Sequence, residues 1–187
     1  MKKYLFIAMM CLFAVNLAAC NLFAKEEAEK IPVAAEVSKS MEVDLMNAKG
    51  EKVGMVALTQ ADKGVHLHIL AEGLEPGKKA IHFHETAKCD APKFEGAGSH
   101  FNPGGKEHGF KNPKGYHAGD LPNLTVEADG TVDLEITTPE VTLNASEANS
   151  LLDADGSAIV IHEKEDDYKT NPSGNSGARI VCGEIKK

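Results

Sequence analysis

The sequence contains no tryptophan, and aromatic residues make up only 5% of its 187 residues. Such a chain offers few rings on which nucleic-acid bases could stack. Positive charge is also scarce, because 28 acidic residues against 20 lysines and arginines give a formal net charge of -8. A surface of this charge would repel a phosphate backbone, so nucleic-acid binding is excluded.

The hydrophobic and charged fractions, 42% and 26%, are ordinary for a globular protein. They exclude wholesale disorder and a polytopic membrane protein. The length is enough for one domain with a buried core.

The N-terminus carries the pattern of a secretory signal peptide. Lys2 and Lys3 precede an apolar run over residues 4–17, which ends on small residues before Cys20. The four residues that end at Cys20 also resemble the lipobox of bacterial lipoproteins, in which the cysteine becomes the lipidated first residue. The alternative is an ordinary signal peptide with a cysteine near its end by chance.

We therefore expect residues 1–19 to be removed and residues 20–39 to form a lipidated N-terminus and a tether, with a short helix allowed at 24–30. The protein is then exported and lipid-anchored through Cys20 on the extracytoplasmic side of a bacterial membrane. The folded domain is expected over residues 40–187.

Export determines how the remaining cysteines are interpreted. Cys11 leaves with the signal peptide and Cys20 carries the lipid, so Cys89 and Cys182, 93 residues apart, remain. Cysteines outside the cytoplasm usually pair, which predicts a disulfide; two buried free thiols are the alternative. Closing a loop of this length would stabilise the fold by roughly 4–5 kcal/mol in the chain-entropy account.

From residue 41 onward, apolar residues alternate with polar ones, as in strands with one buried face. Strands are predicted at 41–45, 52–59, 65–69, 80–85, 123–127, 130–137, 158–162 and 179–185. Short strands, frequent turns and almost no helical pattern predict an antiparallel β-sandwich or barrel, in which residues 143–152 allow one helical turn. Two long segments, 86–121 and 163–178, are rich in Gly, Pro, Asn and charge, which is typical of functional loops.

Two pairs of histidines lie two residues apart on predicted strands. His82 and His84 therefore face the same side of their strand, so both rings can reach one ion. His66 and His68 repeat the spacing without other ligands near them in the sequence. We interpret that second pair as a solvated strand face, with an accessory metal as the alternative.

Further candidate ligands lie in the first long loop and at a later strand end. His100, His108, His117 and Asp120 fall within 21 residues and form a four-ligand set suited to tetrahedral zinc. His82, His84 and His162 are one nitrogen short of the tetragonal set that suits copper(II). One imidazole that uses both of its nitrogens could complete both sites.

Six segments and one cysteine, taken in order, resemble the copper/zinc superoxide dismutase family from about residue 41 to residue 185. They are 82–85 (His-Phe-His-Glu), Cys89, 98–103 (Gly-Ser-His-Phe-Asn-Pro), 108–109, 117–121 (His-Ala-Gly-Asp-Leu), 162–167 and 174–183. The resemblance implies an all-β fold, an eight-stranded antiparallel Greek-key β-sandwich or flattened barrel with two long functional loops; this family is a known example of sandwich architecture.

The resemblance also implies the metals and their ligands. Copper is bound by His82, His84, His100 and His162, and zinc by His100, His108, His117 and Asp120, with His100 shared. Asp166 would hydrogen-bond a copper histidine and a zinc histidine, His82 and His108, rather than being a solvated acid. Cys89 and Cys182 match the family's internal disulfide. Arg179 matches the arginine at the mouth of the copper channel; a surface ion-pair partner is the alternative.

The implied activity is dismutation of superoxide to dioxygen and hydrogen peroxide. Copper alternates between copper(II) and copper(I), His100 carries a proton, and zinc is the structural and electrostatic partner. The alternative is a noncatalytic zinc/copper-binding surface lipoprotein of the same fold. The segment 167–174 is shorter than in many members and has Pro172 and Ser173 where a Lys-Thr pair often lies, so Lys169 is a candidate for the missing charge. A homodimer and a monomer are both retained.

Overall fold

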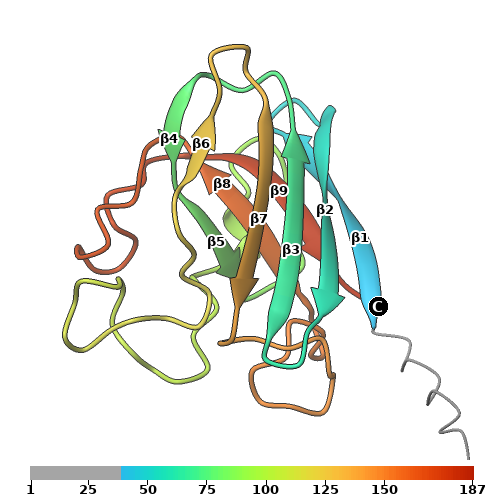
Figure 1. The fold of residues 1–187 in the computed structure, drawn as a ribbon, viewed down its shortest axis with the longest axis vertical. Coiled ribbons are helices and arrows are strands. Elements are labelled where there is room, and N and C mark those ends of the chain that lie inside the picture. The colour runs from blue at the N-terminus through green and yellow to red at the C-terminus, as the bar shows by residue number, and fades with distance from the viewer. Residues whose placement is uncertain (1–38) are drawn as a thin grey trace, which may run out of the picture. The chain divides into compact units, whose positions relative to one another are not determined.

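The computed structural model describes residues 39–187, and strands make up almost all of its regular structure (Figure 1). The predicted signal peptide, the lipid attachment at Cys20 and the short helix at 24–30 lie outside the described residues. Within the described residues, no helix is long and apolar enough to cross a membrane.

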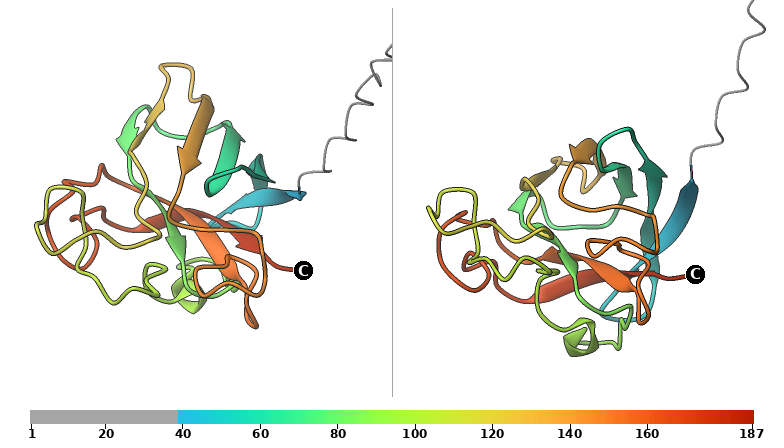
Figure 2. Two further views of the ribbon diagram at one scale, coloured as in Figure 1. Left: turned by 60° about the horizontal axis from the view of Figure 1, so that its bottom comes forward. Right: turned by 90° about the horizontal axis from the view of Figure 1, so that it is seen from below.

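Nine strands occur in this part of the chain. They are β1 (Ser40–Asn47), β2 (Lys52–Gln60), β3 (Val65–Ala71), β4 (Gly77–Lys79), β5 (Ile81–His84), β6 (Leu124–Val126), β7 (Val132–Thr138), β8 (Ser157–His162) and β9 (Arg179–Ile185). Seven form one antiparallel sheet in the order β5-β8-β9-β1-β2-β3-β7, and β4 pairs with β6 in a second, small sheet. The large sheet curls into a half-barrel (Figure 2), which confirms the predicted all-β antiparallel fold.

The alternation that predicted the strands is visible in their burial. In β3, Val65, Leu67 and Ile69 are buried while His66 and His68 are partly exposed. Because successive side chains of a strand point to opposite faces, one face of β3 covers the core and the other faces solvent. In contrast, β8 is buried along its whole length, because Phe94 and Ala97 of the first long loop pack against the side chains of its second face.

One strand of the structure was not predicted, and one segment in which a helical turn was allowed is not helical. The strand β4 was not predicted, because its Gly-Lys-Lys sequence has no apolar alternation; it forms by pairing with Leu124–Val126. The segment 143–152 forms turns instead of a helix, and Leu151 donates its backbone N–H to the carbonyl of Thr142 at 2.9 Å. This bond closes the segment on itself and directs Leu143 and Leu151 into the core.

The two long loops lie side by side at one side of the sheet, as both views of Figure 2 show. The backbone N–H of Lys111 donates to the carbonyl of Tyr168 at 2.8 Å, and that of His108 donates to the Asn171 side chain at 3.0 Å. The first loop also contains the described residues' only helical turn, the 3₁₀ helix η1 (Glu95–Ala97). These contacts hold the part of the first loop around His108 against the middle of the second loop.

The predicted disulfide between Cys89 and Cys182 is present, with Cα atoms 5.7 Å apart. Cys89 is in the first long loop and Cys182 is buried in β9. The bridge therefore attaches the loop to the last strand across a separation of 93 residues. Constraining so long a segment of the unfolded chain favours the folded state.

Candidate metal centre

Strand β5 is the base on which the site is built. All four of its residues are buried, and it pairs with β8 so that His82 lies opposite Val160 and His84 opposite Ala158. His162 ends β8, where its N–H donates to the carbonyl of Ala80, immediately before β5, at 2.9 Å. Three imidazoles from two neighbouring strands therefore converge on one side of the sheet.

The first long loop runs alongside β5 and adds the remaining ligands. Phe83 donates to the carbonyl of Gly119 at 2.9 Å, and Phe101 donates to that of Phe83 at 2.8 Å. These bonds place His100 beside His84 and Asp120 beside His82. Gly119 makes this approach possible, since a Cβ at this position would overlap the carbonyl oxygen of Phe83.

Four buried ring nitrogens have no hydrogen-bond partner among the described residues: Nδ1 of His82 and Nε2 of His84, His100 and His162. Buried polar atoms without partners are rare, because each one costs free energy. One ligand nitrogen of each of these four histidines lies within 4.8 Å of the others. The four unpartnered nitrogens therefore form one cluster. The set consists of four nitrogens, which is the type of donor set that suits copper(II).

In two of these rings the opposite nitrogen donates a hydrogen bond. Nδ1 of His84 donates to the carbonyl of Gly98 at 3.0 Å, and Nε2 of His82 donates to a carboxylate oxygen of Asp166 at 2.9 Å. Since a carbonyl or carboxylate can only accept, the proton is on the outer nitrogen and the lone pair is on the inner one. His82 and His84 are therefore in the tautomers that metal binding requires.

A second set surrounds one oxygen of Asp120. Nδ1 of His100 and of His108 lie 3.0 Å from Oδ1, Nδ1 of His117 lies 3.3 Å from it, and the Nδ1 atoms of His100 and His117 are 3.4 Å apart. A tetrahedron with its centre about 2.0 Å from each corner has edges of about 3.3 Å, the geometry of a closed zinc site. The donor set and its spacing both fit zinc.

His100 belongs to both sets, with Nε2 in the first and Nδ1 in the second. Asp166 belongs to neither but connects them, because Oδ2 accepts from His82 at 2.9 Å and Oδ1 accepts from His108 at 3.0 Å. The carboxylate is buried, and each of its two oxygens accepts a hydrogen bond that orients one ring. Two separate ligand sets are thus coupled through one ring and one carboxylate.

The pKa values of the ring nitrogens follow from their surroundings. Burial lowers the pKa of His100 to about 4 and that of His162 to about 3, and it also lowers those of His82 and His84. Neutral rings are therefore available to a metal well below neutral pH.

His108 is the exception among these histidines. Burial would lower its pKa, but hydrogen bonds to Asp120 and Asp166 outweigh burial and raise it to about 9. The pKa values of both carboxyls are held below their usual range; burial would raise them, and the histidine hydrogen bonds overcome that effect.

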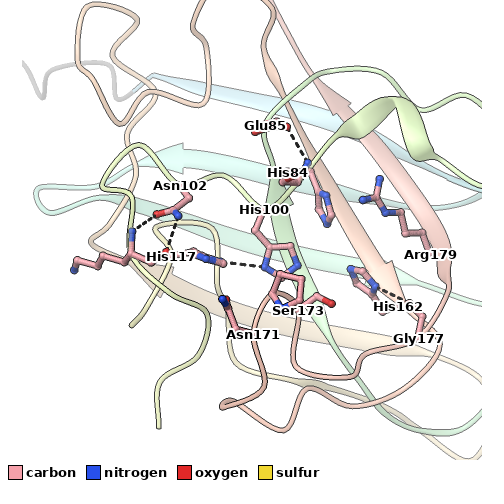
Figure 3. A pocket seen from close by; sticks show the side chains of 13 residues that line it. His84, Glu85, His100, Asn102, His117, His162, Asn171, Ser173, Gly177 and Arg179 are labelled. Carbon is pink, nitrogen blue, oxygen red and sulfur yellow. Dashed lines mark hydrogen bonds between the residues drawn. The ribbon is translucent and has the colours of Figure 1, made fainter. Parts of the chain in front are cut away.

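A pocket of about 620 Å³ opens above the first set (Figure 3). His84, His100 and His162 line its floor, and Arg179, which pairs with His162 across β8 and β9, lines its side. Arg179 donates to the carbonyls of Phe94 at 2.6 Å and Gly98 at 2.5 Å, so its guanidinium is held in place. A half-buried cation in this position favours small anions as ligands.

The site contains residues that the sequence pattern did not indicate. Asn123 clasps the backbone of Asp166 from both sides, donating to its carbonyl at 2.9 Å and accepting from its N–H at 2.8 Å. Lys106 and Asn171 line the pocket, whereas Lys169, the predicted source of the missing charge, does not. No local signal could have found these residues, because their roles depend on loops that meet only in the folded chain.

His66 and His68 lie away from these sets, on the solvent-facing side of β3. Nδ1 of His66 is 3.1 Å from the hydroxyl of Thr137, and Nε2 of His68 is 2.9 Å from Asp133 on β7. These contacts are those of a solvated strand face.

Comparisons with known proteins agree in pointing to one family. The family model described as "Copper/zinc superoxide dismutase (SODC)" matches residues 52–185. The chain is 45% identical over 185 residues to the superoxide dismutase-like protein YojM of Bacillus subtilis, covering 96% of this chain and 94% of that protein. It is 46% identical over 144 residues to a copper/zinc superoxide dismutase of Aquifex aeolicus, covering 76% and 85%.

Solved structures give the same result. A double mutant of a superoxide dismutase-like protein from Bacillus subtilis, in which a tyrosine and a proline are replaced by histidine, superposes with a TM-score of 0.77 at 52% identity, covering 78% of this chain and 97% of that one. The copper/zinc superoxide dismutase from Brucella abortus superposes with a TM-score of 0.65 at 30% identity, covering 79% and 99%.

Proposed function

The chain belongs to the copper/zinc superoxide dismutase family, and from this premise we propose that it converts two superoxide ions and two protons into dioxygen and hydrogen peroxide. The observation that carries the proposal is the convergence of four unpartnered buried nitrogens beside a separate tetrahedral set. The family's cofactors are copper and zinc, and both sets have the donors that these ions prefer.

We assign copper to His82, His84, His100 and His162, and zinc to His100, His108, His117 and Asp120. When bound, copper supplies the one-electron change that takes an electron from one superoxide and gives it to the next, and zinc supplies fixed positive charge. The protein's own residues hold the rings in place, exclude bulk water from the buried nitrogens and deliver the substrate.

His100 has the central position in this scheme. Its Nδ1 lies 3.0 Å from Oδ1 of Asp120, which keeps the ring in place. Its Nε2 belongs to the first ligand set, at the floor of the pocket that His100 lines. Nε2 of His100 is therefore the atom that we assign to hold the proton needed by the second superoxide and to return it. The buried Asp166 keeps the neighbouring rings of His82 and His108 from turning toward that proton.

Arg179 supports substrate capture despite the net charge of -8. Its guanidinium stays positive beside the floor of the pocket, and its two carbonyl partners fix its direction. A local positive potential in a cleft raises the capture rate of an anion roughly 10-fold or more, an effect known for superoxide dismutases.

Replacing Arg179 with Glu should reduce the second-order rate of dismutation and leave the copper and zinc contents unchanged. Pulse radiolysis on the metal-loaded variant and the parent measures this rate. An unchanged rate would remove the capture role from Arg179.

A second candidate function is storage or buffering of zinc and copper without catalysis. It is favoured by the 45% identity to a protein named only as superoxide dismutase-like. Against it, every metal-ligand position predicted from the family pattern carries a ligand residue in this chain. The two functions share the same sites and differ only in turnover.

The test combines metal analysis with activity in His162→Ala. The parent should hold copper and zinc at about one of each per chain and should dismutate superoxide. The variant should lose copper and activity but keep zinc, because His162 belongs to the first set alone. His66 is a partly exposed histidine on β3, so His66→Ala is the matched control and should change neither value. A copper-loaded parent without dismutation would establish the storage function instead.

We also propose export and lipid anchoring through Cys20, supported by the apolar run and the small residues before it. Cell fractionation tests this placement. The full chain should sediment with the membrane, and a Cys20→Ser variant should not carry lipid by mass spectrometry.

A further inference from the structure

We propose that Ser176 is a positioning residue for His162, and that its hydroxyl holds this ring with the metal-facing nitrogen free to bind copper. The inference rests on the proposed function, because it gives Ser176 a part in the copper site of that function. Ser176 belongs to neither ligand set. It is only 1% exposed, and its Oγ lies 3.2 Å from Nδ1 of His162.

His162 has the longest backbone hydrogen bond of the first set. In the other three rings, the nitrogen outside this set lies 2.9 or 3.0 Å from a carbonyl or carboxylate oxygen. Nδ1 of His162 lies 3.4 Å from the carbonyl oxygen of Gly177, beyond the usual range of an N–H···O hydrogen bond. The Ser176 hydroxyl is therefore its closer partner, and among the described residues it belongs to the only side chain that hydrogen-bonds this nitrogen.

The hydroxyl suits the tautomer that metal binding requires. Nε2 of His162 has no hydrogen-bond partner among the described residues and belongs to the first ligand set. When this nitrogen presents its lone pair, the ring carries its proton on Nδ1. A serine hydroxyl can accept a hydrogen bond, so Oγ of Ser176 accepts from that N–H. Accepting this bond fixes the orientation of the ring and makes it a stronger donor to a cation at Nε2.

The position of the hydroxyl is fixed by the chain that follows β8. Lys164, two residues after His162, donates its backbone N–H to the carbonyl of Ser176 at 2.9 Å. Glu163 likewise donates to the carbonyl of Ala178 at 2.8 Å. These bonds attach the end of the second long loop to the residues directly after the histidine. The hydroxyl and the ring are therefore held against each other by the backbone on both sides.

The test measures the copper(II) affinity of Ser176→Ala in the zinc-loaded protein, by competition with a chelator of known affinity. Removing an orienting partner of a metal ligand costs about 10–100-fold in affinity, and we expect a loss of about 10-fold because the carbonyl of Gly177 remains. The zinc content should stay at the level of the parent, since His162 belongs to the first set alone.

The reduction potential of the copper-loaded protein is a second readout, which a merely structural role of Ser176 would not change. A stronger ring donor favours copper(II), the ion of higher charge, over copper(I). A tenfold loss of copper(II) affinity alone corresponds to a rise of about 59 mV in a one-electron potential. Ser176→Ala should show a rise of this size in a spectroelectrochemical titration.

Ser157 provides a matched control. It is a fully buried serine of β8 whose hydroxyl has no hydrogen-bond partner among the described residues, and it belongs to neither ligand set. Ser157→Ala removes the same group and should leave the copper affinity and the potential unchanged. Equal changes in both variants would show that loss of a buried hydroxyl is enough to cause them, and would overturn the proposal.

These readouts separate the inference from the proposed function, because neither requires turnover of superoxide. A parent that binds copper in this Ser176-dependent way without dismutating superoxide would defeat the proposed function and support the role of Ser176. A parent that dismutates superoxide but has the same copper affinity and potential as Ser176→Ala would support the function and refute the inference.

Discussion

At the scale of single residues, Asp166 connects the two ligand sets without belonging to either. Its oxygens accept from His82 at 2.9 Å and from His108 at 3.0 Å, and Asn123 holds its backbone. An amide in its place would present an N–H to one of these rings, which already donates. That ring would have to turn or change tautomer, and its metal-facing nitrogen would be lost.

We therefore expect Asp166→Asn to weaken binding of at least one of the two metals by about 10–100-fold, the usual cost of removing an orienting partner of a metal ligand. Competition with chelators of known affinity measures this loss. Glu165→Gln is the control, since Glu165 is exposed and outside the hydrogen-bonded cluster. Equal affinities in both variants would show that the bridge does not orient the rings.

Buried histidines also make stability depend on pH. Burial holds the pKa of His100 at about 4 and that of His162 at about 3, against about 6.5 in an unfolded chain. Between these values the unfolded state binds more protons, so the unfolding free energy of the metal-free protein should fall as pH falls from about 6.5 toward 4. Urea midpoints of chelator-treated protein at pH 6.5, 5.5 and 4.5 measure this slope.

His108 has the opposite effect on the pH dependence of stability. Its pKa is raised to about 9 because the hydrogen bonds to Asp120 and Asp166 outweigh burial, so its contribution is present below about 6.5 and is lost as pH rises through 9. The metal-free protein should then be most stable near pH 6.5. A urea midpoint that is flat or rises toward pH 4.5 would contradict the assignment of neutral buried rings.

At the scale of elements, the second long loop approaches the cluster so closely that one position requires glycine. Gly174 has a φ of +66°, and a Cβ there would overlap Oδ1 of Asp166 and lie 2.8 Å from Nε2 of His108. The backbone of this loop is thus packed directly against the bridge between the two ligand sets. The loop covers the buried carboxylate as well as forming one wall of the pocket.

Gly174→Ala should therefore lower both stability and metal affinity. The strained backbone and the overlap with Asp166 together should cost about 1–3 kcal/mol of unfolding free energy. Gly50→Ala is the matched control, since Gly50 has a φ of +77° but no atom within 4 Å of the added Cβ. Urea unfolding and metal content should show a larger loss for Gly174→Ala. Equal losses would mean that the backbone conformation alone is responsible.

At the scale of the whole molecule, three long-range connections hold the site together. The Cys89–Cys182 bridge spans 93 residues, the pairing of β5 with β8 joins residues 81–84 to 158–161, and the first ligand set draws on β5, the first long loop and β8. A metal that binds only where these segments meet binds the folded state and not the unfolded one. Its binding energy therefore adds to the stability of the entire domain.

Metal removal should consequently lower the thermal midpoint. At a free metal concentration about 100 times its Kd, each bound ion adds about 2.7 kcal/mol. In a domain of this size, that stabilisation corresponds to a shift of roughly 5–11 °C. Calorimetry of the chelated protein, the zinc-loaded protein and the protein with both metals should show two upward steps. His117→Ala should lose the zinc step, and a midpoint independent of metal would contradict the folded-state sites.

Much of the fold was predictable because its signals are local. Alternation in residues 65–71 predicts a strand with one buried face, and the two-residue spacing of His82 and His84 places both rings on one side. The strand β4 was not predicted, because its sequence has no apolar alternation. Residues 143–152 have apolar residues at helical spacing but form turns. Pairing with β6 and burial of Leu143 decide these segments instead.

The sequence by itself determined the family resemblance, the strand faces, the ligand types and the cysteines available to pair. Only the tertiary structure decided which ring nitrogen carries the proton, that Asn123 clasps Asp166, and that Lys106 instead of Lys169 reaches the pocket. The physical reason is how far apart in the sequence the interacting residues lie. Side-chain periodicity is a property of consecutive residues. The hydrogen bonds between Asn123 and Asp166, 43 positions apart, exist only after the loops have packed over the sheet.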